Sequence, residues 1–388
     1  MKKICYASCC CSKETYEKLW KNNMPSAPTQ SVQKYHRLFA QGFAGNGYDV
    51  DMISFITVPR QKTQEFELGE KETTEELNYY YLPYSKKKYI RHFRAIIDSY
   101  KLTRSILKTN GEFSLGDVLC TSVSLGCMLG TLKERKKFYA IVTDLPTMFA
   151  GYQRTLKYYI EQYIIRKASG YIVLTEDMNL AINKENKPYV VLEGHVDAKE
   201  GKKIPVTNKL TEKFIVMYAG NVAKKYGIAY LVEGFIKANI KDSELHLYGN
   251  GDYSTELIEI SKKNPNVIYF GERLNTEIIE AEKNATLLVN PRPSKDEYTK
   301  YSFPSKNMEY MLSGTPLLTT ILPGMPMEYL DYIFTLKEEN ANGMAKRLLE
   351  ISNMNVEDLK RKGELAREFV LREKTNLKQA RKVINTMC

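Results

Sequence analysis

The feature that most constrains the fold of this chain is an alternation of apolar strands and amphipathic helices that occurs twice. The first run predicts strands at residues 4–8, 50–55, 79–82, 117–120, 140–142 and 170–173, and helices at 32–43, 89–108 and 158–167. The second predicts strands at 214–218, 244–248, 267–270, 286–289 and 317–319, and helices at 230–238, 253–262, 276–282 and 304–312. Strands interleaved with helices form parallel sheets with right-handed crossovers. The sequence therefore predicts two doubly wound, Rossmann-like α/β domains.

A polar stretch at residues 197–213 separates the two runs, as a linker would. The 388 residues fit two domains of ordinary size. We expect one domain at residues 1–205, a second at 206–370, and a C-terminal helix at 371–388 that packs back on the first. Ligands of doubly wound sheets bind beyond the carboxyl ends of the strands. Chemistry is therefore expected in the loops after the strands, in a cleft that the two domains face.

The net charge of +11 is unevenly distributed, with +9 up to residue 205 and +2 in the remainder. The basic excess is gathered at residues 86–108 and 133–137. A basic patch on one domain can bind anionic lipid headgroups, a diphosphate-linked acceptor or nucleic acid, and a solvated charged face is the alternative. The sequence has no signal peptide and no apolar stretch long enough to span a membrane. We expect a cytoplasmic protein.

The cysteine pattern favours a reducing compartment. Cys9, Cys10 and Cys11 are contiguous, Cys5, Cys120 and Cys127 lie in apolar runs, and Cys388 is terminal. No pair of CxxC motifs occurs, and the chain has four histidines. We expect buried, reduced thiols rather than a zinc or redox site.

The segment from residue 301 to 316, YSFPSKNMEYMLSGTP, is the most informative stretch of the second half. It predicts a loop that leads into a short helix, with Ser302 as its cap, Pro304 in its first turn and Gly314 at its end. The free N–H groups and the positive dipole end at a helix start attract phosphate. We therefore expect an anion site at the start of this helix.

Two charged side chains extend this prediction. Lys306 adds a positive charge at the helix start, and Glu309 lies three residues later on the same side. A carboxylate there can accept hydrogen bonds from two neighbouring hydroxyls, such as those of a ribose. The alternative is a capped surface helix with an ordinary Lys–Glu pair.

The segment resembles the donor loop of retaining glycosyltransferases of the GT-B fold, family four. That family carries two glutamates eight positions apart, before an ending of a small residue, Gly and Pro. Glu309 followed by residues 313–316 matches the second glutamate, which in the family holds the nucleotide ribose. Tyr301 stands where the first glutamate, which contacts the donor sugar, is usual. The resemblance implies that Lys306 is catalytic and that Tyr301, Ser302, Phe303, Ser305 and Glu309 bind the donor.

Further stretches of the second half resemble the same family. Residues 218–227 resemble the glycine turn after the first strand of its C-terminal domain, where the family's phosphate-clamping Arg and Lys fall at Asn221 and Tyr226. Residues 247–251, 266–271 and 290–293 resemble the strand ends that surround the donor. The resemblance assigns to donor binding Gly220, Asn221, Lys225, Gly249, Arg273 and Arg292.

The N-terminal half resembles the family more loosely. Asp144 follows a predicted strand, in a loop that approaches the reacting sugar in related enzymes. The resemblance assigns it a catalytic role in orienting hydroxyls, and a turn-initiating Asp is the alternative. His195 lies in a marker before the linker, where a hinge role and a catalytic role are equally open.

The resemblance implies a glycosyltransferase that moves a sugar from a nucleoside diphosphate sugar to the hydroxyl of a saccharide or a polyprenyl diphosphate-linked acceptor. It further implies retention of configuration and a role in cell-surface polysaccharide synthesis. We expect no metal and no cofactor besides the nucleotide sugar as co-substrate. The basic first domain suggests peripheral binding to the inner face of the membrane, where the partner is an anionic membrane surface.

Three alternatives remain at this stage. Tyr301 in place of glutamate is consistent with a catalytically silent partner that binds nucleotide sugar within a polysaccharide-synthesis complex. An inverting transferase or an epimerase would use the same fold. Charge alone favours a nucleic-acid-binding protein, but the chain has one Trp and no recognition motif, so we expect no nucleic acid.

Overall fold

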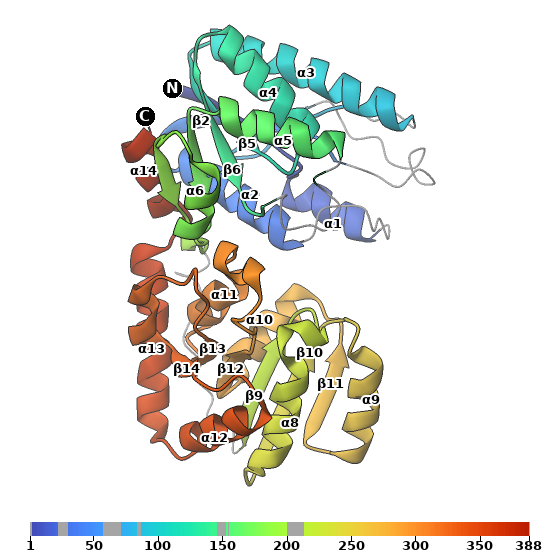
Figure 1. The fold of residues 1–388 in the computed structure, drawn as a ribbon, viewed down its shortest axis with the longest axis vertical. Coiled ribbons are helices and arrows are strands. Elements are labelled where there is room, and N and C mark those ends of the chain that lie inside the picture. Colours follow the sequence, from blue (N-terminus) through green and yellow to red (C-terminus); the bar gives the residue numbers. More distant parts are fainter. Residues whose placement is uncertain are drawn as a thin grey trace. The chain divides into compact units, whose positions relative to one another are not determined.

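The computed structural model describes residues 2–21, 30–56, 71–83, 87–145, 153, 155–199 and 213–387. The chain divides into two compact units, one formed by Met1–Asp197 with Thr375–Cys388 and the other by Ala198–Lys374 (Figure 1). Each unit is a largely parallel β-sheet with helices, which confirms the predicted α/β class. The boundary predicted after residue 205 lies outside the described residues. The boundary predicted after residue 370 falls within helix α13, which continues to Glu373.

The first unit contains an eight-stranded sheet in the order β3-β4-β2-β1-β5-β6-β7-β8. The strands are β1 (Lys2–Ser8), β2 (Tyr48–Ser54), β3 (Lys71–Thr73), β4 (Asn78–Tyr81), β5 (Gly111–Asp117), β6 (Lys137–Val142), β7 (Gly170–Val173) and β8 (Tyr189–Val191). All neighbours pair in parallel except β3, which is antiparallel to β4. Residues 4–8 of the central β1 are buried, as is usual for a strand covered on both faces.

The helices of the first unit surround this sheet. They are α1 (Lys13–Lys21), α2 (Gln30–Ala44), α3 (Lys88–Lys108), α4 (Thr121–Lys133), α5 (Leu156–Lys167), α6 (Glu176–Ile182) and the C-terminal α14 (Asn376–Met387). α14 packs on α2, where the Asn376 amide donates to Leu38 O at 3.1 Å. A Cβ on Gly42 would lie 2.3 Å from Asn376 O, so glycine permits this close approach of the two backbones.

The second unit contains a six-stranded parallel sheet in the order β11-β10-β9-β12-β13-β14. The strands are β9 (Phe214–Ala219), β10 (Ser243–Tyr248), β11 (Val267–Gly271), β12 (Leu287–Asn290), β13 (Leu317–Thr320) and β14 (Phe334–Leu336). Its helices are η4 (Lys224–Tyr226), α8 (Ile228–Ala238), α9 (Ser254–Lys263), α10 (Asn275–Asn284), η5 (Glu297–Tyr301), α11 (Ser305–Ser313), η6 (Met327–Tyr332), α12 (Ala341–Ser352) and α13 (Val356–Glu373). Every strand and helix predicted in this half is present, with ends shifted by one or two residues.

Two predictions in the first half were wrong. Residues 117–120, predicted as a strand, are the last residue of β5 and the turn into α4, with Cys120 as the N-cap residue of that helix. α4 was missed because its apolar and small residues are buried around much of its circumference and form no single stripe. The acidic stretch at 65–76, predicted as a loop, contains β3, a short charged edge strand.

Across the described ranges, no helix combines the length and the apolar character needed to cross a membrane.

Candidate functional site

The strands of the second unit bring the predicted donor-binding turns to one edge of the sheet. β9, β10 and β12 are adjacent, and their carboxyl ends lead to Gly220, Gly249 and Arg292. α11 begins after the η5 turn that follows β12. Because parallel strands end at the same edge, residues about 70 positions apart are collected there.

Gly220 and Gly249 hold two of these turns against each other. Gly220 N donates to Tyr248 O at 2.9 Å, and Gly249 N donates to Gly271 O at 2.8 Å. A Cβ on Gly249, whose φ is +115°, would lie 1.8 Å from the carbonyl oxygen of Gly220. Only glycine allows two backbones to approach this closely.

Lys306 lies directly against the Gly220 turn. A Cβ on Gly220 would be 2.2 Å from Lys306 Cε and 2.7 Å from Nζ, so the missing side chain makes room for the lysine. Lys306 is half-buried, and among the described residues its Nζ makes no hydrogen bond or ion pair. The structure therefore presents a cation over a glycine backbone at the ligand edge of the sheet.

The start of α11 differs from the predicted cap. The N-cap residue is Pro304, whose ring offers no hydrogen-bond acceptor, and the hydroxyl of Ser302 makes no capping bond. The cap prediction for Ser302 was wrong because the helix begins at Ser305, two residues later than a Ser302 cap requires. The first N–H groups of α11 thus lack a side-chain acceptor, which favours anion binding there. Gly314 ends the helix at φ +82°, as predicted.

Tyr310 fixes α11 to the Gly220 turn. Its buried hydroxyl accepts from Ala219 N at 2.8 Å and donates to Ala219 O at 3.2 Å. Ala219 is the last residue of β9 and directly precedes Gly220. Because Tyr310 lies four residues after Lys306, this pair of bonds sets the position of Lys306 relative to the turn.

Arg292 lies close to two aromatic rings. Its guanidinium carbon lies 4.9 Å from the Tyr298 ring centroid and 5.4 Å from that of Tyr226. Burial raises the pKa of the Tyr218 hydroxyl, which lies beside Gly220, and the positive charge of Arg292 opposes this rise. Contact with two rings restrains the guanidinium, and a guanidinium can bind an acceptor such as a phosphate through two parallel hydrogen bonds.

Several buried polar groups in this segment lack a protein partner. Within the described residues, no hydrogen bond is made by Arg292 Nε, Tyr298 OH, Ser302 Oγ or Asn307 Nδ2. Asn307 Oδ1 accepts from Asn290 Nδ2 at 2.7 Å, so the oxygen of this amide has a partner and its nitrogen has none. Buried polar groups without protein partners usually bind water or a ligand. All four belong to residues 292–307, and all four can donate.

Residues 213–353 match the model of the family described as glycosyl transferases group 1. The matched stretch lies within the second unit.

Solved glycosyltransferases share the fold of the whole chain. Sucrose-phosphate synthase from Thermosynechococcus elongatus aligns with a TM-score of 0.68 at 16% identity, covering 99% of this chain and 98% of that one. HepE of Anabaena, solved with UDP, gives 0.66 at 11% identity, covering 100% and 99%. TarM of S. aureus, a mutant solved with UDP among other ligands, gives 0.64 at 13% identity, covering 100% and 99%. A search of curated proteins finds no match. The chain is a glycosyltransferase with the GT-B fold.

Three residues predicted to bind the donor are exposed. Asn221 follows the Gly220 turn, and its carbonyl accepts from Tyr218 OH at 2.9 Å. Lys225 lies in η4 with its Nζ 5.1 Å from the ring centroid of Tyr226. Arg273 follows β11 and donates to Glu272 O at 3.0 Å.

The other donor-loop residues that were predicted to bind the donor differ in how deeply their side chains are buried. Phe303 is buried, with its ring centroid 5.1 Å from that of Tyr329, so only its backbone is available to a donor. Tyr301 and Glu309 are half-buried, and Ser305 is exposed as the first residue of α11. Glu309 lies one turn after Lys306, as its spacing predicted.

The two residues singled out in the first unit have different surroundings. Asp144 is exposed in the bend after β6. His195 is buried, and its Nε2 donates to Tyr35 O at 2.8 Å. Burial lowers the pKa of His195 to about 4, so the ring is neutral at pH 7. Its stacking on Phe39, with ring centroids 5.7 Å apart, gives His195 a packing role within this unit.

The sequence did not single out Tyr310, Tyr298 or Asn307. Tyr310 carries a weak signal, because a hydroxyl in the buried stripe of a helix requires a partner. The contact of Arg292 with its two rings joins loops after β9 and β12, and neither stretch contains a local sign of it.

Proposed function

We propose that this glycosyltransferase moves a sugar from a nucleoside diphosphate sugar to an acceptor hydroxyl with retention of configuration. The observation that carries the proposal is the placement of Lys306 Nζ over the Gly220 backbone at the uncapped start of α11. A lysine, free helix N–H groups and an arginine together form a site for a diphosphate.

In the proposed reaction the anomeric C–O bond to the diphosphate breaks while the acceptor oxygen bonds to the same face of the sugar. The leaving phosphate takes the proton of the acceptor hydroxyl, so the chain supplies no carboxylate base. Lys306 and the N–H groups of α11 stabilise the charge that grows on the phosphate, and preorganised donors of this kind supply much of the rate enhancement in many enzymes. Ser302, Ser305 and Arg292 bind phosphate oxygens, and Glu309 accepts from the ribose hydroxyls. Asp144 orients the reacting hydroxyls.

The solved neighbours support a nucleoside diphosphate donor, because both HepE and TarM were solved with UDP. They share only the fold with this chain, so the choice of base is left to experiment. We propose a role in cell-surface polysaccharide synthesis, with a saccharide or a polyprenyl diphosphate-linked acceptor. A fold neighbour described as a lipopolysaccharide outer core galactosyltransferase supports this role by analogy.

The proposal is tested by incubating the purified chain with UDP-, GDP-, ADP- and CMP-sugars, alone and with lipid-linked or saccharide acceptors. Hydrolysis or transfer with one diphosphate donor, and an α-anomer from an α-linked donor by NMR, supports the proposal. An inverted anomer would contradict retention alone. Binding of a donor without turnover under any condition would favour the silent partner that Tyr301 suggests.

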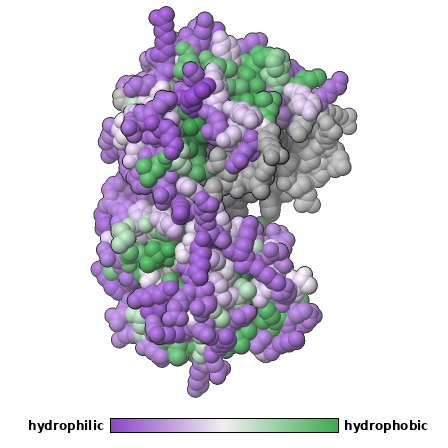
Figure 2. Space-filling view, viewed as in Figure 1, coloured by the Kyte–Doolittle hydropathy of each residue, from purple (hydrophilic) through white to green (hydrophobic). Residues whose placement is uncertain are grey.

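The first unit carries a surface suited to a membrane interface. At the start of α3, Tyr89, Ile90 and Phe93 are 86%, 46% and 64% exposed, and the exposed Arg94 lies among them. Figure 2 shows hydrophobic residues gathered on the upper part of this unit, among hydrophilic ones. Exposed aromatic residues interleaved with basic ones are typical of helices that lie in the headgroup region. We propose that this face binds anionic lipid on the cytoplasmic side of the membrane.

Replacing Phe93 with Ser and Arg94 with Gln together should lower binding to anionic vesicles by roughly tenfold or more, from lost apolar burial and one lost charge. Flotation with phosphatidylglycerol vesicles measures the bound fraction, and phosphatidylcholine vesicles provide the uncharged comparison. Lys306→Ala should float as the wild type does. Wild-type flotation that does not depend on anionic lipid would contradict the proposed surface.

A further inference from the structure

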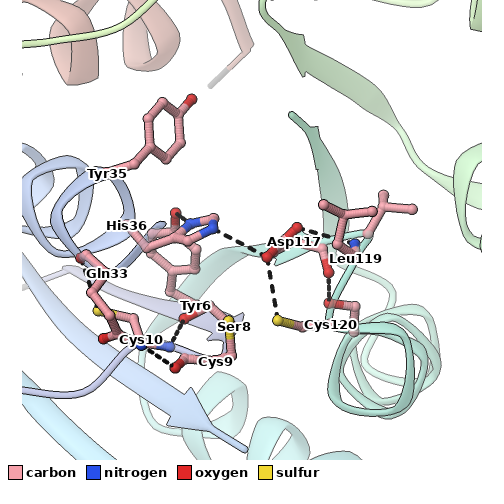
Figure 3. A network of polar contacts seen from close by, with 12 residues as sticks. Tyr6, Ser8, Cys9, Cys10, Gln33, Tyr35, His36, Asp117, Leu119 and Cys120 are labelled. Carbon is pink, nitrogen blue, oxygen red and sulfur yellow. Dashed lines mark hydrogen bonds and ion pairs between the residues drawn. The ribbon is translucent and has the colours of Figure 1, made fainter. Parts of the chain in front are cut away.

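Two thiols and one carboxylate lie together in the first unit, at the edge where the parallel strands of its sheet end (Figure 3). The predicted donor residues around Lys306 belong to the second unit. Cys9 directly follows β1, Asp117 ends β5, and Cys120 precedes α4. β1 and β5 are neighbouring parallel strands, so both ends meet. One ligand atom from each of the three residues lies within 4.8 Å of the other two. Among the described residues, no other three His, Cys, Asp or Glu side chains bring their ligand atoms this close together.

The carboxylate of Asp117 is fixed by its surroundings. Its Oδ1 accepts from Leu119 N at 3.0 Å, and its Oδ2 lies 3.1 Å from Nε2 of the buried His36. His36 Nδ1 is in turn 2.7 Å from Tyr6 OH. The neutral tautomer that donates from Nε2 and accepts at Nδ1 satisfies both contacts. Asp117 is therefore held in one orientation, as the ligands of a metal site usually are.

The loop that carries Cys9 is also held. The buried Gln33 of α2 donates from Nε2 to Cys9 O at 2.8 Å and accepts from Cys11 N at 2.8 Å. Cys10 Sγ is directed to Cys11 O and Gln33 O, at 3.4 and 3.5 Å. Of the three contiguous cysteines, Cys9 is the one whose sulfur joins the Asp117 cluster.

We propose that Cys9, Asp117 and Cys120 bind one Zn²⁺ through two thiolates and one carboxylate oxygen. Two soft sulfur ligands select zinc over magnesium or calcium, which prefer oxygen. In a tetrahedral site with Zn–S bonds of about 2.3 Å, two sulfur ligands lie about 3.8 Å apart. The contact between Cys120 Sγ and Asp117 Oδ2 is 3.2 Å, so small side-chain shifts complete the geometry.

Zinc binding replaces protons at the cluster. Each thiol loses its proton to solvent, and the Cys120 S–H bond to Asp117 gives way to two metal bonds. His36 keeps its bond to the carboxylate. Three protein ligands leave a fourth position for water or a substrate oxygen, and Cys9 and Cys120 are both partly exposed. This inference revises the expectation that all the cysteines are simple buried thiols, and it does not depend on the donor site.

The experiment uses the full chain, purified under reducing conditions, stripped of metal and titrated with Zn²⁺ against a chromophoric chelator. We expect one zinc per chain. Co²⁺ in its place should give a thiolate-to-cobalt charge-transfer band and the visible bands of tetrahedral cobalt. Cys9→Ser and Cys120→Ser should each weaken zinc binding by roughly 100-fold or more, and Tyr6→Phe by about tenfold through His36.

Cys127→Ala is the matched control. Cys127 Sγ lies 3.8 Å from Cys5 Sγ, and both thiols are buried. Among the described residues, these two belong to no group of three possible metal ligands. This variant should bind zinc as the wild type does. Circular dichroism of the metal-free variants separates lost ligation from lost folding. A reduced wild type that binds neither metal, or a control that loses zinc as Cys9→Ser does, would overturn the proposal. A Cys9–Cys120 disulfide that forms in preference to zinc binding, despite reductant, would overturn it too.

Discussion

Replacing Lys306 with alanine should lower the turnover number at least about 100-fold, which corresponds to about 2.7 kcal/mol of transition-state stabilisation. The lysine lies against the Gly220 backbone at the start of α11, where we propose that the diphosphate leaves. Its charge matters most when the sugar–phosphate bond breaks, because charge then grows on the leaving oxygen. The loss should therefore appear mainly in kcat, with a smaller change in KM.

The fold should survive the Lys306 substitution. Lys306 is half-buried and makes no ion pair among the described residues, so the melting temperature without donor should change little. Lys262→Ala is the matched control, since Lys262 is an exposed lysine of the same unit, paired with Glu259 at 2.7 Å. It should keep wild-type turnover. Near-normal turnover in Lys306→Ala would show that this lysine has no catalytic role, and it would contradict the proposed mechanism.

Gly249→Ala should destabilise the second unit by about 3 kcal/mol, from overpacking together with a positive φ. The added Cβ would meet Gly220 O at 1.8 Å, and this oxygen belongs to backbone that cannot rotate away. Gly271→Ala is the matched control: its φ is +67° and nothing lies within 4 Å of the added Cβ. It should cost only about 1 kcal/mol.

Urea unfolding followed by far-UV circular dichroism resolves the two glycine variants. Gly249→Ala should shift the dichroism transition to lower urea than Gly271→Ala does. Equal midpoints for Gly249→Ala and Gly271→Ala would show that the contact between the two turns is not tight.

The second unit could be predicted from sequence because its signals are local. Its strands are short apolar runs, its helices are amphipathic, and Gly314 marks a helix end that needs a positive φ. The start of α11 was misplaced because two residues, Ser302 and Pro304, carry competing signals for a helix start. Pro304 became the N-cap residue, which left the serine hydroxyl without a bond.

Contacts between distant segments could not be predicted in the same way. Lys306 and Gly220 were each assigned to the donor site, but the lysine lying on the glycine depends on the Tyr310 bonds to Ala219. Cys9 and Cys120 lie in different motifs, and the pairing of β1 with β5 brings them together. Contacts of this kind depend on the order of the strands in the sheet. The alternation of strands and helices along the sequence does not determine that order.

The central claim, that the edge formed by Gly220, Lys306 and Glu309 binds a nucleoside diphosphate sugar, is tested most directly by donor-dependent thermal stabilisation. One member of a panel of UDP-, GDP-, ADP- and CMP-sugars should raise the melting temperature of the wild type by about 5 °C at a hundredfold excess over Kd. Glu309→Ala should lose most of this shift, and Glu280→Ala, an exposed glutamate of the same unit, should keep it. A wild type that no donor stabilises, or a Glu309→Ala variant that responds as the wild type does, would contradict the account.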